Sequence, residues 1–214
     1  MEADIKSFFD NINHRIMIKM LTQRVDDRSL LRLIWKWLKA GVMEPTGDII
    51  NPITGTPQGG IVSSVLSNIY LHYVLDLWHE KRAKPSCTGG TNFIRYADDY
   101  VATFQNYRDA KQFMQEMKTR LKKFNLELAP DKTRLLMFDR FKKERSKRFE
   151  FLGFEFWWGT SQTGKDMLMH RTATSKYRQS VINIKEWCKS NRNKRIRNIF
   201  TMMNRKLTGY YNYY

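Results

Sequence analysis

The sequence has little of several features that mark whole classes of protein. It contains only two cysteines, Cys87 and Cys188, which lie far apart and outside any Cys-x-x-Cys spacing. This usage predicts free thiols in a reducing compartment. No apolar run approaches the length of a membrane span, and the first residues show no signal-peptide pattern. We therefore expect no membrane partner. The sequence also has no internal repeat and no low-complexity tract.

Acidic residues are scarce as well. The chain has 21 Asp and Glu against 38 Lys and Arg, a formal net charge of +17. The imbalance is concentrated in residues 132–214, which hold 20 Lys and Arg against 6 Asp and Glu, or +14 of the +17. A basic, aromatic-rich C-terminal part predicts a polyanionic partner, and favours nucleic acid over an anionic membrane. The alternative is a generally solvated basic surface.

The remaining composition is that of a folded protein. With 214 residues, 42% hydrophobic and 14% aromatic, the chain is long enough to bury a core. Hydrophobic periodicity and turn residues predict the following elements: a strand end at 2–6, helices at 14–24 and 28–40 capped by Asn13 and Asp27, a hairpin within 42–54, a helix from about 60, a hairpin around 98–99, a helix at 107–124, strands at 133–138, 149–158 and 166–170, and basic helices after 175. This order predicts an α+β fold, a ferredoxin-like palm with an antiparallel sheet covered by helices on one face, followed by a helical segment.

The helix that starts near residue 60 carries apolar residues at helical spacing: Val62, Val65, Leu66, Ile69, Tyr73 and Leu77. This pattern predicts that their face belongs to the core. Pro85, Gly89 and Gly90 predict that residues 81–92 form a loop.

The segment from Phe93 to Phe104 carries two adjacent acids between short runs typical of strands. On a straight strand, neighbouring side chains point to opposite faces, whereas at a hairpin tip Asp98 and Asp99 can reach the same rim. Two carboxylates held that close repel each other unless a cation lies between them. The pair therefore indicates a divalent-metal site; a polar surface turn is the alternative.

Asp4, at the end of the first predicted strand, is expected beside this hairpin, so that three carboxylates converge. Oxygen ligands of this kind suit Mg²⁺, with Mn²⁺ as a substitute, and leave positions for waters and substrate phosphates. Two such ions can activate an attacking hydroxyl and stabilise a departing pyrophosphate.

Four motifs together resemble one enzyme family. They are Asp4-Ile5-Lys6-Ser7-Phe8-Phe9-Asp10, Gly55-Thr56-Pro57-Gln58-Gly59-Gly60 with the Ser-x-x-x-Ser-Asn-Ile-Tyr-Leu segment that follows, Tyr96-Ala97-Asp98-Asp99 and Phe151-Leu152-Gly153-Phe154. Their order and spacing resemble those of reverse transcriptases, most closely the bacterial group II intron-encoded proteins, also called maturases. The resemblance covers nearly the whole chain. It implies an RNA-directed DNA polymerase that uses two metal ions.

The resemblance also implies roles for single residues. Asp4 and Asp98 match the metal-binding aspartates, Asp99 completes the acidic cluster, and Ile5 would offer its backbone carbonyl to the metal. Lys132 matches a lysine proposed to neutralise or protonate the leaving pyrophosphate; without the resemblance it is a solvated surface charge.

Substrate and nucleic-acid contacts follow in the same way. Phe9 matches the position under the incoming sugar, where a ring crowds a 2′-hydroxyl and favours deoxynucleotides; the alternative is a core phenylalanine. Gln58 and Gly59 match the nucleotide pocket, where glycine lets the backbone approach a ligand closely.

The C-terminal part resembles regions that hold nucleic acid. Residues 151–154 match the primer grip, in which Gly153 leaves room for a sugar-phosphate backbone; a buried strand is the alternative. The basic helices resemble the start of the thumb, or domain X. The residues expected to contact phosphates there are Arg192, Lys194, Arg195, Arg205 and Lys206.

The family pattern predicts the domain organisation. Residues 1–170 would form a palm and residues 171–214 the start of a thumb. Family members carry fingers before the Asp4 motif, so the chain resembles a palm and partial thumb without fingers. Expected partners are an RNA template, a DNA primer, deoxynucleoside triphosphates, structured intron RNA, and a fingers segment or second protomer, in the bacterial cytoplasm.

Other functions stay open at this point. The chain could be a non-enzymatic splicing cofactor that binds intron RNA, or an inactive fragment; an RNA-templated RNA polymerase is disfavoured by Phe9. Among reverse transcriptases, the sequence does not distinguish intron mobility from CRISPR-associated, diversity-generating or defence roles, and it does not give the oligomeric state.

Overall fold

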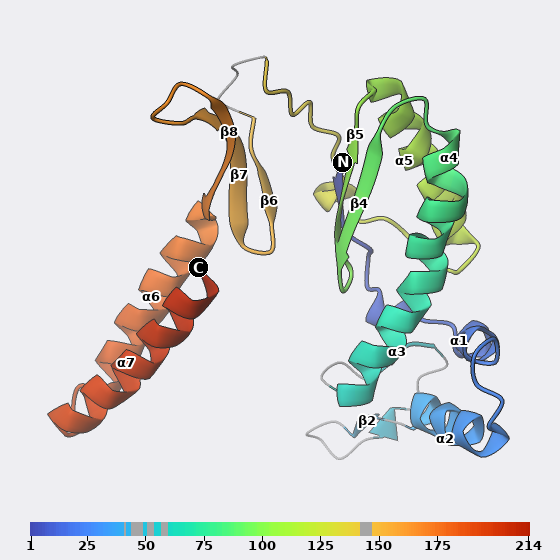
Figure 1. Ribbon diagram of the computed structural model, residues 1–214. Coiled ribbons are helices and arrows are strands. Elements are labelled where there is room, and N and C mark those ends of the chain that lie inside the picture. Colours follow the sequence, from blue (N-terminus) through green and yellow to red (C-terminus); the bar gives the residue numbers. More distant parts are fainter. Residues whose placement is uncertain (41, 44–48, 51–53, 57–59, 142–146) are drawn as a thin grey trace. The chain divides into compact units, whose positions relative to one another are not determined.

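The computed structural model describes residues 1–214 apart from 41, 44–48, 51–53, 57–59 and 142–146 (Figure 1). The chain divides into two compact units, Met1–Leu136 and Met137–Tyr214. The predicted palm (1–170) and thumb (171–214) stay predictions, because compactness alone does not define these domains.

An antiparallel sheet organises the first unit. Its strands are β1 (Glu2–Ala3), β4 (Thr91–Tyr96) and β5 (Asp99–Phe104), in the order β1-β5-β4. On its other edge, Glu2 of β1 forms an isolated antiparallel bridge with Arg134. Ile5, two residues after β1, forms a second isolated bridge with Leu128. The strand predicted at 133–138 is wrong beyond Arg134, because residues 135–138 form no strand and the chain passes into the second unit there.

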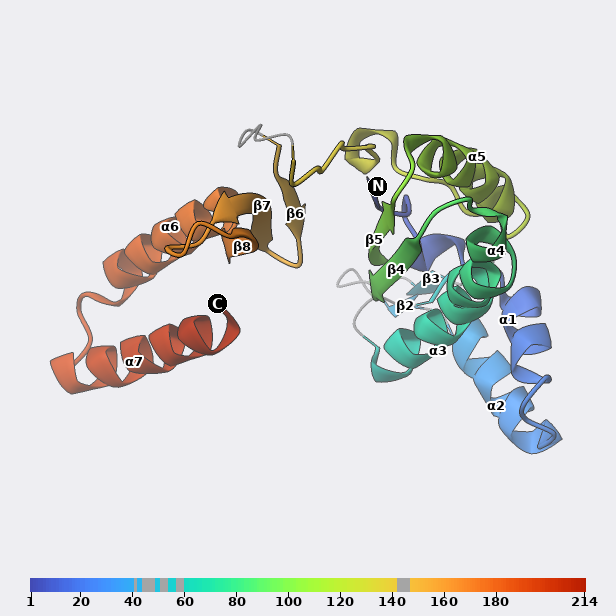
Figure 2. The ribbon, with the colours of Figure 1, turned by 45° about the horizontal axis from the view of Figure 1, so that its top comes forward.

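Helices cover one face of this sheet. The α-helical elements are α1 (His14–Leu21), α2 (Arg28–Lys39), α3 (Ile61–Leu71), α4 (Lys84–Ser86) and α5 (Tyr107–Lys122), with 3₁₀ turns η1 (Phe9–Asn11) and η4 (Pro130–Lys132) and a small hairpin of β2 (Val42–Met43) and β3 (Ile49–Ile50). Figures 1 and 2 show α3, α4 and α5 on the same side of β4 and β5. The core between them includes Tyr70, Tyr100, Phe113 and Met117. The α+β fold class is thus confirmed.

The two helix starts that were predicted from capping residues are confirmed. The Asn13 side chain accepts a hydrogen bond from the Ile16 amide, and Asp27 accepts from the amides of Ser29 and Leu30. Asn106 precedes α5 but makes no capping bond, and instead donates to the Thr88 hydroxyl.

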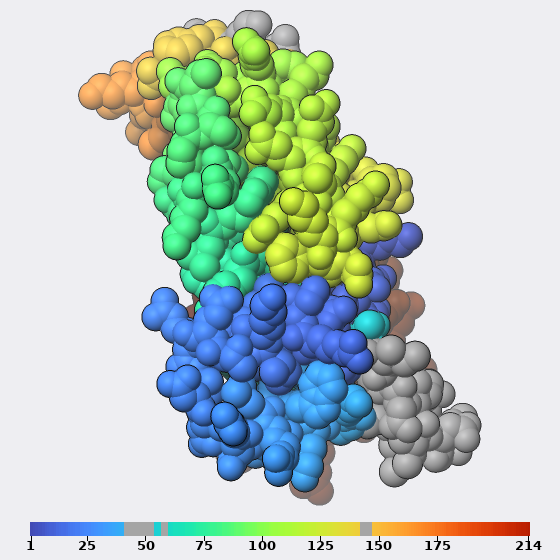
Figure 3. All heavy atoms as spheres, turned by 90° about the vertical axis from the view of Figure 1, so that its right-hand side faces the viewer, coloured from blue at the N-terminus to red at the C-terminus, as the bar shows by residue number. Residues whose placement is uncertain are grey.

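The long helix continues further than its proline and glycines indicate. After α3 the chain passes through two π-helical segments, η2 (His72–Asp76) and η3 (His79–Ala83), and enters α4. Figure 3 shows this green stretch side by side with the yellow-green α5 on the outer face of the unit. The loop predicted at 81–92 is wrong for residues 81–86, which continue the helix, and for residues 91–92, which begin β4, while residues 87–90 lie outside helices and strands.

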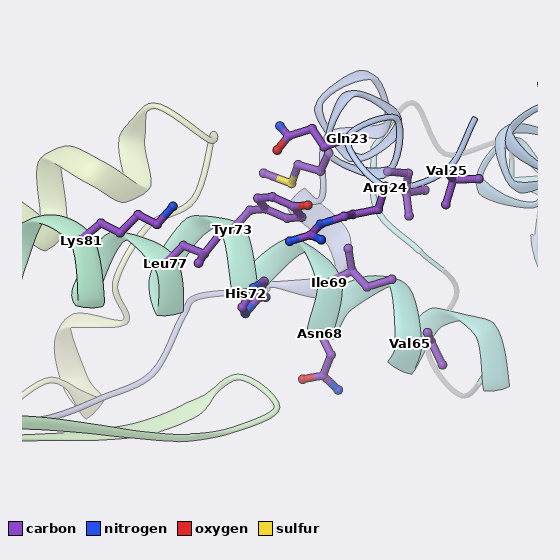
Figure 4. Close-up of a pocket in the computed structure, with 12 residues that line it drawn as sticks. Gln23, Arg24, Val25, Val65, Asn68, Ile69, His72, Tyr73, Leu77 and Lys81 are labelled. Atoms are coloured by element: carbon purple, nitrogen blue, oxygen red, sulfur yellow. The ribbon is translucent and has the colours of Figure 1, made fainter. Parts of the chain in front are cut away.

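The apolar stripe predicted for this helix does not face the core as a whole. Leu66 is buried, but Val65 is 57% exposed and Val62 is 39% exposed. The cavity of about 1000 Å³ beside the helix is lined by Val65, Ile69, Tyr73 and Leu77 together with residues at the end of α1, including Met20, Leu21 and Arg24 (Figure 4). Tyr70, Leu71, Val74 and Leu75 fill the core instead. The helix is apolar on two sides, so periodicity alone could not identify the side that meets the sheet.

The second unit is a three-stranded antiparallel sheet with two helices. Its elements are β6 (Phe149–Phe151), β7 (Phe154–Thr160), β8 (Asp166–Thr172), α6 (Thr174–Asn191) and α7 (Ile196–Tyr213). The single strand predicted at 149–158 is instead a hairpin that turns at Leu152 and Gly153. The strand at 166–170 and the two C-terminal helices are confirmed. Among the described residues, no helix is long and apolar enough to cross a membrane.

Candidate active site

The Asp4 end of β1 meets the tip of the β4–β5 hairpin. Tyr96 pairs with Asp99, which leaves a two-residue turn of Ala97 and Asp98. On the other side of β5, Ala3 pairs with Tyr100, so that Asp4 follows the last paired residue of β1 near the start of β5 at Asp99. The first strand and the hairpin therefore bring these acids to one edge of the sheet.

A lysine lies against these acids from the opposite side of β1. The Ala129 amide donates to the Asp4 carbonyl over 2.9 Å, which fixes the turn that carries Lys132. The Lys132 ammonium then donates to Asp4 Oδ2 over 2.6 Å. The hydrogen bond to Asp4 and the charge of Asp4 raise the pKa of Lys132 above its ordinary value, with smaller contributions from Asp99 and Asp98. Lys132 is thus a protonated cation at neutral pH, held in the field of three carboxylates.

Tyr100, which pairs with Ala3 next to this edge, was not predicted from the sequence. Its side chain is 1% exposed, and no described residue hydrogen-bonds its hydroxyl. Burial, followed by the negative charge of Asp4, raises the pKa of Tyr100 well above its usual range. The phenol is therefore neutral, and it lies within the field of the Asp4 charge.

The Phe9 and Gly55 motifs, 46 residues apart in the chain, lie together in space. The Thr56 amide donates to the Phe9 carbonyl and the Gly55 amide to the Ile12 carbonyl, both over 2.8 Å. Gly55 has φ of +93°, and a Cβ there would lie 2.7 Å from the Phe9 carbonyl oxygen, so only glycine fits. Phe9 is partly buried against the core and its ring lies 5.3 Å from that of Phe8. Two of the predicted residues of this pocket, Gln58 and Gly59, lie outside the described residues.

In the second unit, the predicted primer-grip motif forms a tight hairpin turn. Phe151 pairs with Phe154, and the turn residues Leu152 and Gly153 have φ of +51° and +78°. The Tyr213 hydroxyl donates to the Leu152 carbonyl over 3.0 Å, and the ring of Tyr214 lies 5.3 Å from that of Phe154. The C-terminal tyrosines therefore pack against this turn.

The predicted phosphate-contacting residues of the second unit all lie on its surface. Each is exposed: Arg192, Lys194, Arg195, Arg205 and Lys206. The Lys206 ammonium lies 5.7 Å from the centre of the Trp187 ring, a cation–π contact between α7 and α6. Their exposure is compatible with binding a polyanion, and their role in nucleic-acid binding stays a prediction.

Sequence comparison identifies the family. The sequence model of the family described as reverse transcriptase (RNA-dependent DNA polymerase) matches residues 1–156. This chain belongs to the reverse transcriptase family. Its acids at the β4–β5 turn and its Asp4 lie within the matched region of this reverse transcriptase.

Sequence similarity to individual proteins supports this assignment. The group II intron-encoded protein LtrA of Lactococcus lactis subsp. cremoris is 28% identical over 72% of this chain and 34% of its own length. The protein YkfC of Escherichia coli is 37% identical over 38% of this chain and 21% of its own length. The chain thus spans about a third of the length of LtrA. The structure of telomerase from Candida albicans in complex with a fragment of telomeric RNA shares the fold, with a TM-score of 0.55 and 15% identity over 72% of this chain and 29% of that one.

The donor chemistry of the acidic edge fits the divalent metal that reverse transcriptases generally use. Within the described residues, no group of three or more His, Cys, Asp or Glu side chains is arranged so that it could hold a metal ion. However, the acids supply the carboxylate oxygens that Mg²⁺ prefers, and the Lys132 ammonium already occupies a cation position 2.6 Å from Asp4 Oδ2. The edge therefore attracts cations, and its ligands are of the right kind.

Proposed function

We propose that this reverse transcriptase is an RNA-directed DNA polymerase of the group II intron type, working in the bacterial cytoplasm. The observation that carries the proposal is the meeting of Asp4, the Asp98–Asp99 turn and Lys132 at one edge of the sheet. The reaction would join a deoxynucleotide to the 3′-hydroxyl of a DNA primer that is paired with an RNA template.

The acids and the lysine divide the work of that reaction. Asp4, Asp98 and Asp99, with the Ile5 carbonyl, would hold two Mg²⁺ ions, which, when bound, lower the pKa of the primer hydroxyl and stabilise charge on the phosphates. The hydroxyl oxygen forms a bond to the α-phosphorus while the bond from that phosphorus to the β-phosphate bridging oxygen breaks. The Lys132 ammonium would neutralise or protonate the pyrophosphate that leaves.

Other residues would select and hold the substrates. Phe9 would lie under the sugar of the incoming nucleotide and exclude a 2′-hydroxyl, while Gln58 and Gly59 would line the same pocket. Residues 151–154 would hold the primer end, and the basic helices α6 and α7 would contact the phosphates of template RNA or structured intron RNA.

Primer extension on an RNA template tests this proposal. The complete natural polypeptide that contains this chain would be assayed with Mg²⁺ and either deoxynucleotides or ribonucleotides, beside its Asp98→Ala variant. We expect extension with deoxynucleotides, much less with ribonucleotides, and a loss of at least about 100-fold in the variant. Salt-sensitive RNA binding should survive the substitution.

Three outcomes would contradict the proposal. Extension that is unchanged in Asp98→Ala would remove Asp98 from the chemistry. Equal use of ribonucleotides would contradict the role of Phe9. RNA binding without any extension by the wild-type protein would favour the alternative, a splicing cofactor that binds intron RNA without polymerising DNA.

A further inference from the structure

The side chain of an arginine next to the β4–β5 turn makes four hydrogen bonds, which connect the long helix to the turn. Arg95 lies on β4, two residues before Ala97, and its side chain is 11% exposed. It donates to both carboxylate oxygens of Asp76, from Nε over 2.8 Å and from Nη2 over 2.6 Å. Its Nη1 donates to the Asn68 side-chain oxygen over 2.9 Å and to the Ala97 carbonyl over 2.8 Å. One guanidinium thus joins the long helix to the hairpin turn.

The shape of the long helix makes this arrangement possible. Asn68 and Asp76 are eight residues apart, and at the α-helical 100° per residue they would lie about 80° apart around the axis. The intervening segment His72–Asp76 is π-helical, with more residues in each turn, and therefore rotates less per residue. Both side chains consequently face Arg95. The Asn68 amide nitrogen is itself fixed by donating to the Ser64 carbonyl over 3.1 Å.

The contact to Ala97 acts on a strained turn. Ala97 has φ of +53°, in the left-handed region that residues with a Cβ seldom adopt. Such a conformation persists only where the surroundings enforce it. Arg95 Nη1 bonds the carbonyl of this residue, and the next two residues in the chain are Asp98 and Asp99.

We infer that Arg95, held by Asp76 and Asn68, is a positioning residue that fixes the β4–β5 turn so that Asp98 and Asp99 keep their place opposite Asp4. This inference rests on the proposed function for its catalytic consequence, but the support of the turn is a property of the chain alone. Only arginine can do this, because a planar fork bonds Asp76 with two N–H groups and still reaches the turn, whereas a lysine offers one point of charge.

Local hydrogen exchange tests the support of the turn without any activity. The variant Arg95→Lys would be compared with Arg120→Lys in the same protein. Arg120 is a matched control, because it is partly buried, donates to the backbone carbonyls of Tyr73 and Val74 on the same long helix, and does not contact the hairpin. We expect amides of residues 94–101 to exchange at least about tenfold faster in Arg95→Lys only, with similar losses of thermal stability in both variants. Unchanged exchange in Arg95→Lys would overturn the inference.

Polymerase kinetics test the catalytic consequence. Displacement of the acids by about 1 Å is expected to lower kcat by about 100-fold in Arg95→Lys, because the reacting groups lose their alignment. The KM for the nucleotide should change far less, since the side-chain bonds of Arg95 go to Asp76, Asn68 and the Ala97 carbonyl. Asn68→Ala, which removes one of the four bonds, should have a smaller effect on kcat.

The outcomes separate this inference from the proposed function. If the wild-type protein does not polymerise, the proposed function fails, while hydrogen exchange still decides whether Arg95 supports the turn. If the wild type polymerises and Arg95→Lys loses no more kcat than Arg120→Lys, the positioning role fails and the proposed function stands.

Discussion

The two hairpins of this chain have the same construction and different supports. The β4–β5 hairpin of the first unit turns at Ala97 and Asp98, and the β6–β7 hairpin of the second unit turns at Leu152 and Gly153. Each turn has a non-glycine residue at positive φ, +53° for Ala97 and +51° for Leu152. Each therefore needs surrounding contacts to hold a conformation that its own residues disfavour.

The supports differ in chemistry. An arginine paired with Asp76 holds the carbonyl of Ala97, whereas the hydroxyl of Tyr213 bonds the Leu152 carbonyl and the Ala173 amide bonds the Gly153 carbonyl. At the turn that carries two acids, the support is an arginine whose own charge is paired with Asp76. An aromatic support suits a turn of apolar residues. The comparison shows that the two tight turns of this chain are held by different means, an ion-paired arginine at one and a tyrosine hydroxyl at the other.

The largest change in stability is expected at the second turn. Gly153→Ala places a Cβ at φ of +78° and 2.9 Å from the Tyr214 hydroxyl oxygen. Strain alone costs about 1–2 kcal/mol, and the tyrosine must also move. Native-state hydrogen exchange of β6 and β7 would measure the loss. Gly164→Ala is the control, because Gly164 has a similar φ of +79° with no atom near its Cβ position. Equal effects at both glycines would show that the tyrosine contact does not matter.

The corresponding change at the first turn should have the opposite sign. Ala97→Gly relieves the left-handed conformation while the bond from Arg95 to the backbone carbonyl remains possible. We expect the free energy of unfolding to rise by about 0.5 kcal/mol. The gain is no larger because glycine has more conformational freedom than alanine in the unfolded chain, which offsets part of the relieved strain. Denaturant unfolding of the variant measures it. A loss of stability would mean that the Ala97 methyl group makes a contact that outweighs its strain.

The smallest effect is an acid dependence confined to the second unit. Burial acts to raise the pKa of Glu155, but its hydrogen bond with Arg171 and the charges of Arg171 and Arg148 hold that pKa below its ordinary value. A depressed folded pKa stabilises the unit above the unfolded pKa of about 4.3, and this stabilisation is lost as the pH falls through the folded pKa.

Glu155→Gln tests this dependence. The variant should remove part of the loss of β7 protection below about pH 4, and leave the acid dependence of the first unit unchanged. If the variant and the wild type respond equally to acid in β7, the ion pairs of Glu155 do not contribute to the stability of this sheet.

The sequence predicted those parts of the molecule that local chemistry decides. The acids between two strand-forming runs predicted the β4–β5 hairpin, and side-chain caps at Asn13 and Asp27 marked two helix starts. Burial of the long helix was predicted only in part. Leu66 is buried and Ile69 and Tyr73 pack against the core, but Val62 and Val65 are exposed, and the π-helical segments change which residues share a face.

The support of the β4–β5 turn could not have been found from spacing. Arg95 is an ordinary strand residue in the sequence, and Asp76 and Asn68 fall on one side of their helix only through a π-helical turn. The contact of Lys132 with Asp4 likewise depends on chain segments 128 residues apart. The resemblance to a family pointed to Lys132 before the structure did, whereas no pattern pointed to Tyr100 or Arg95.

Single-turnover addition of one deoxynucleotide on an RNA template, measured over a range of primer–template concentrations, most directly tests whether the two hairpins serve chemistry and primer binding respectively. For Asp98→Ala we expect the rate at saturating primer–template to fall at least about 100-fold with the Kd of primer–template unchanged. For Gly153→Ala we expect the Kd to rise while the saturating rate is kept. A preserved rate in Asp98→Ala, or the same pattern in both variants, would contradict the assignment of the catalytic centre to the β4–β5 turn.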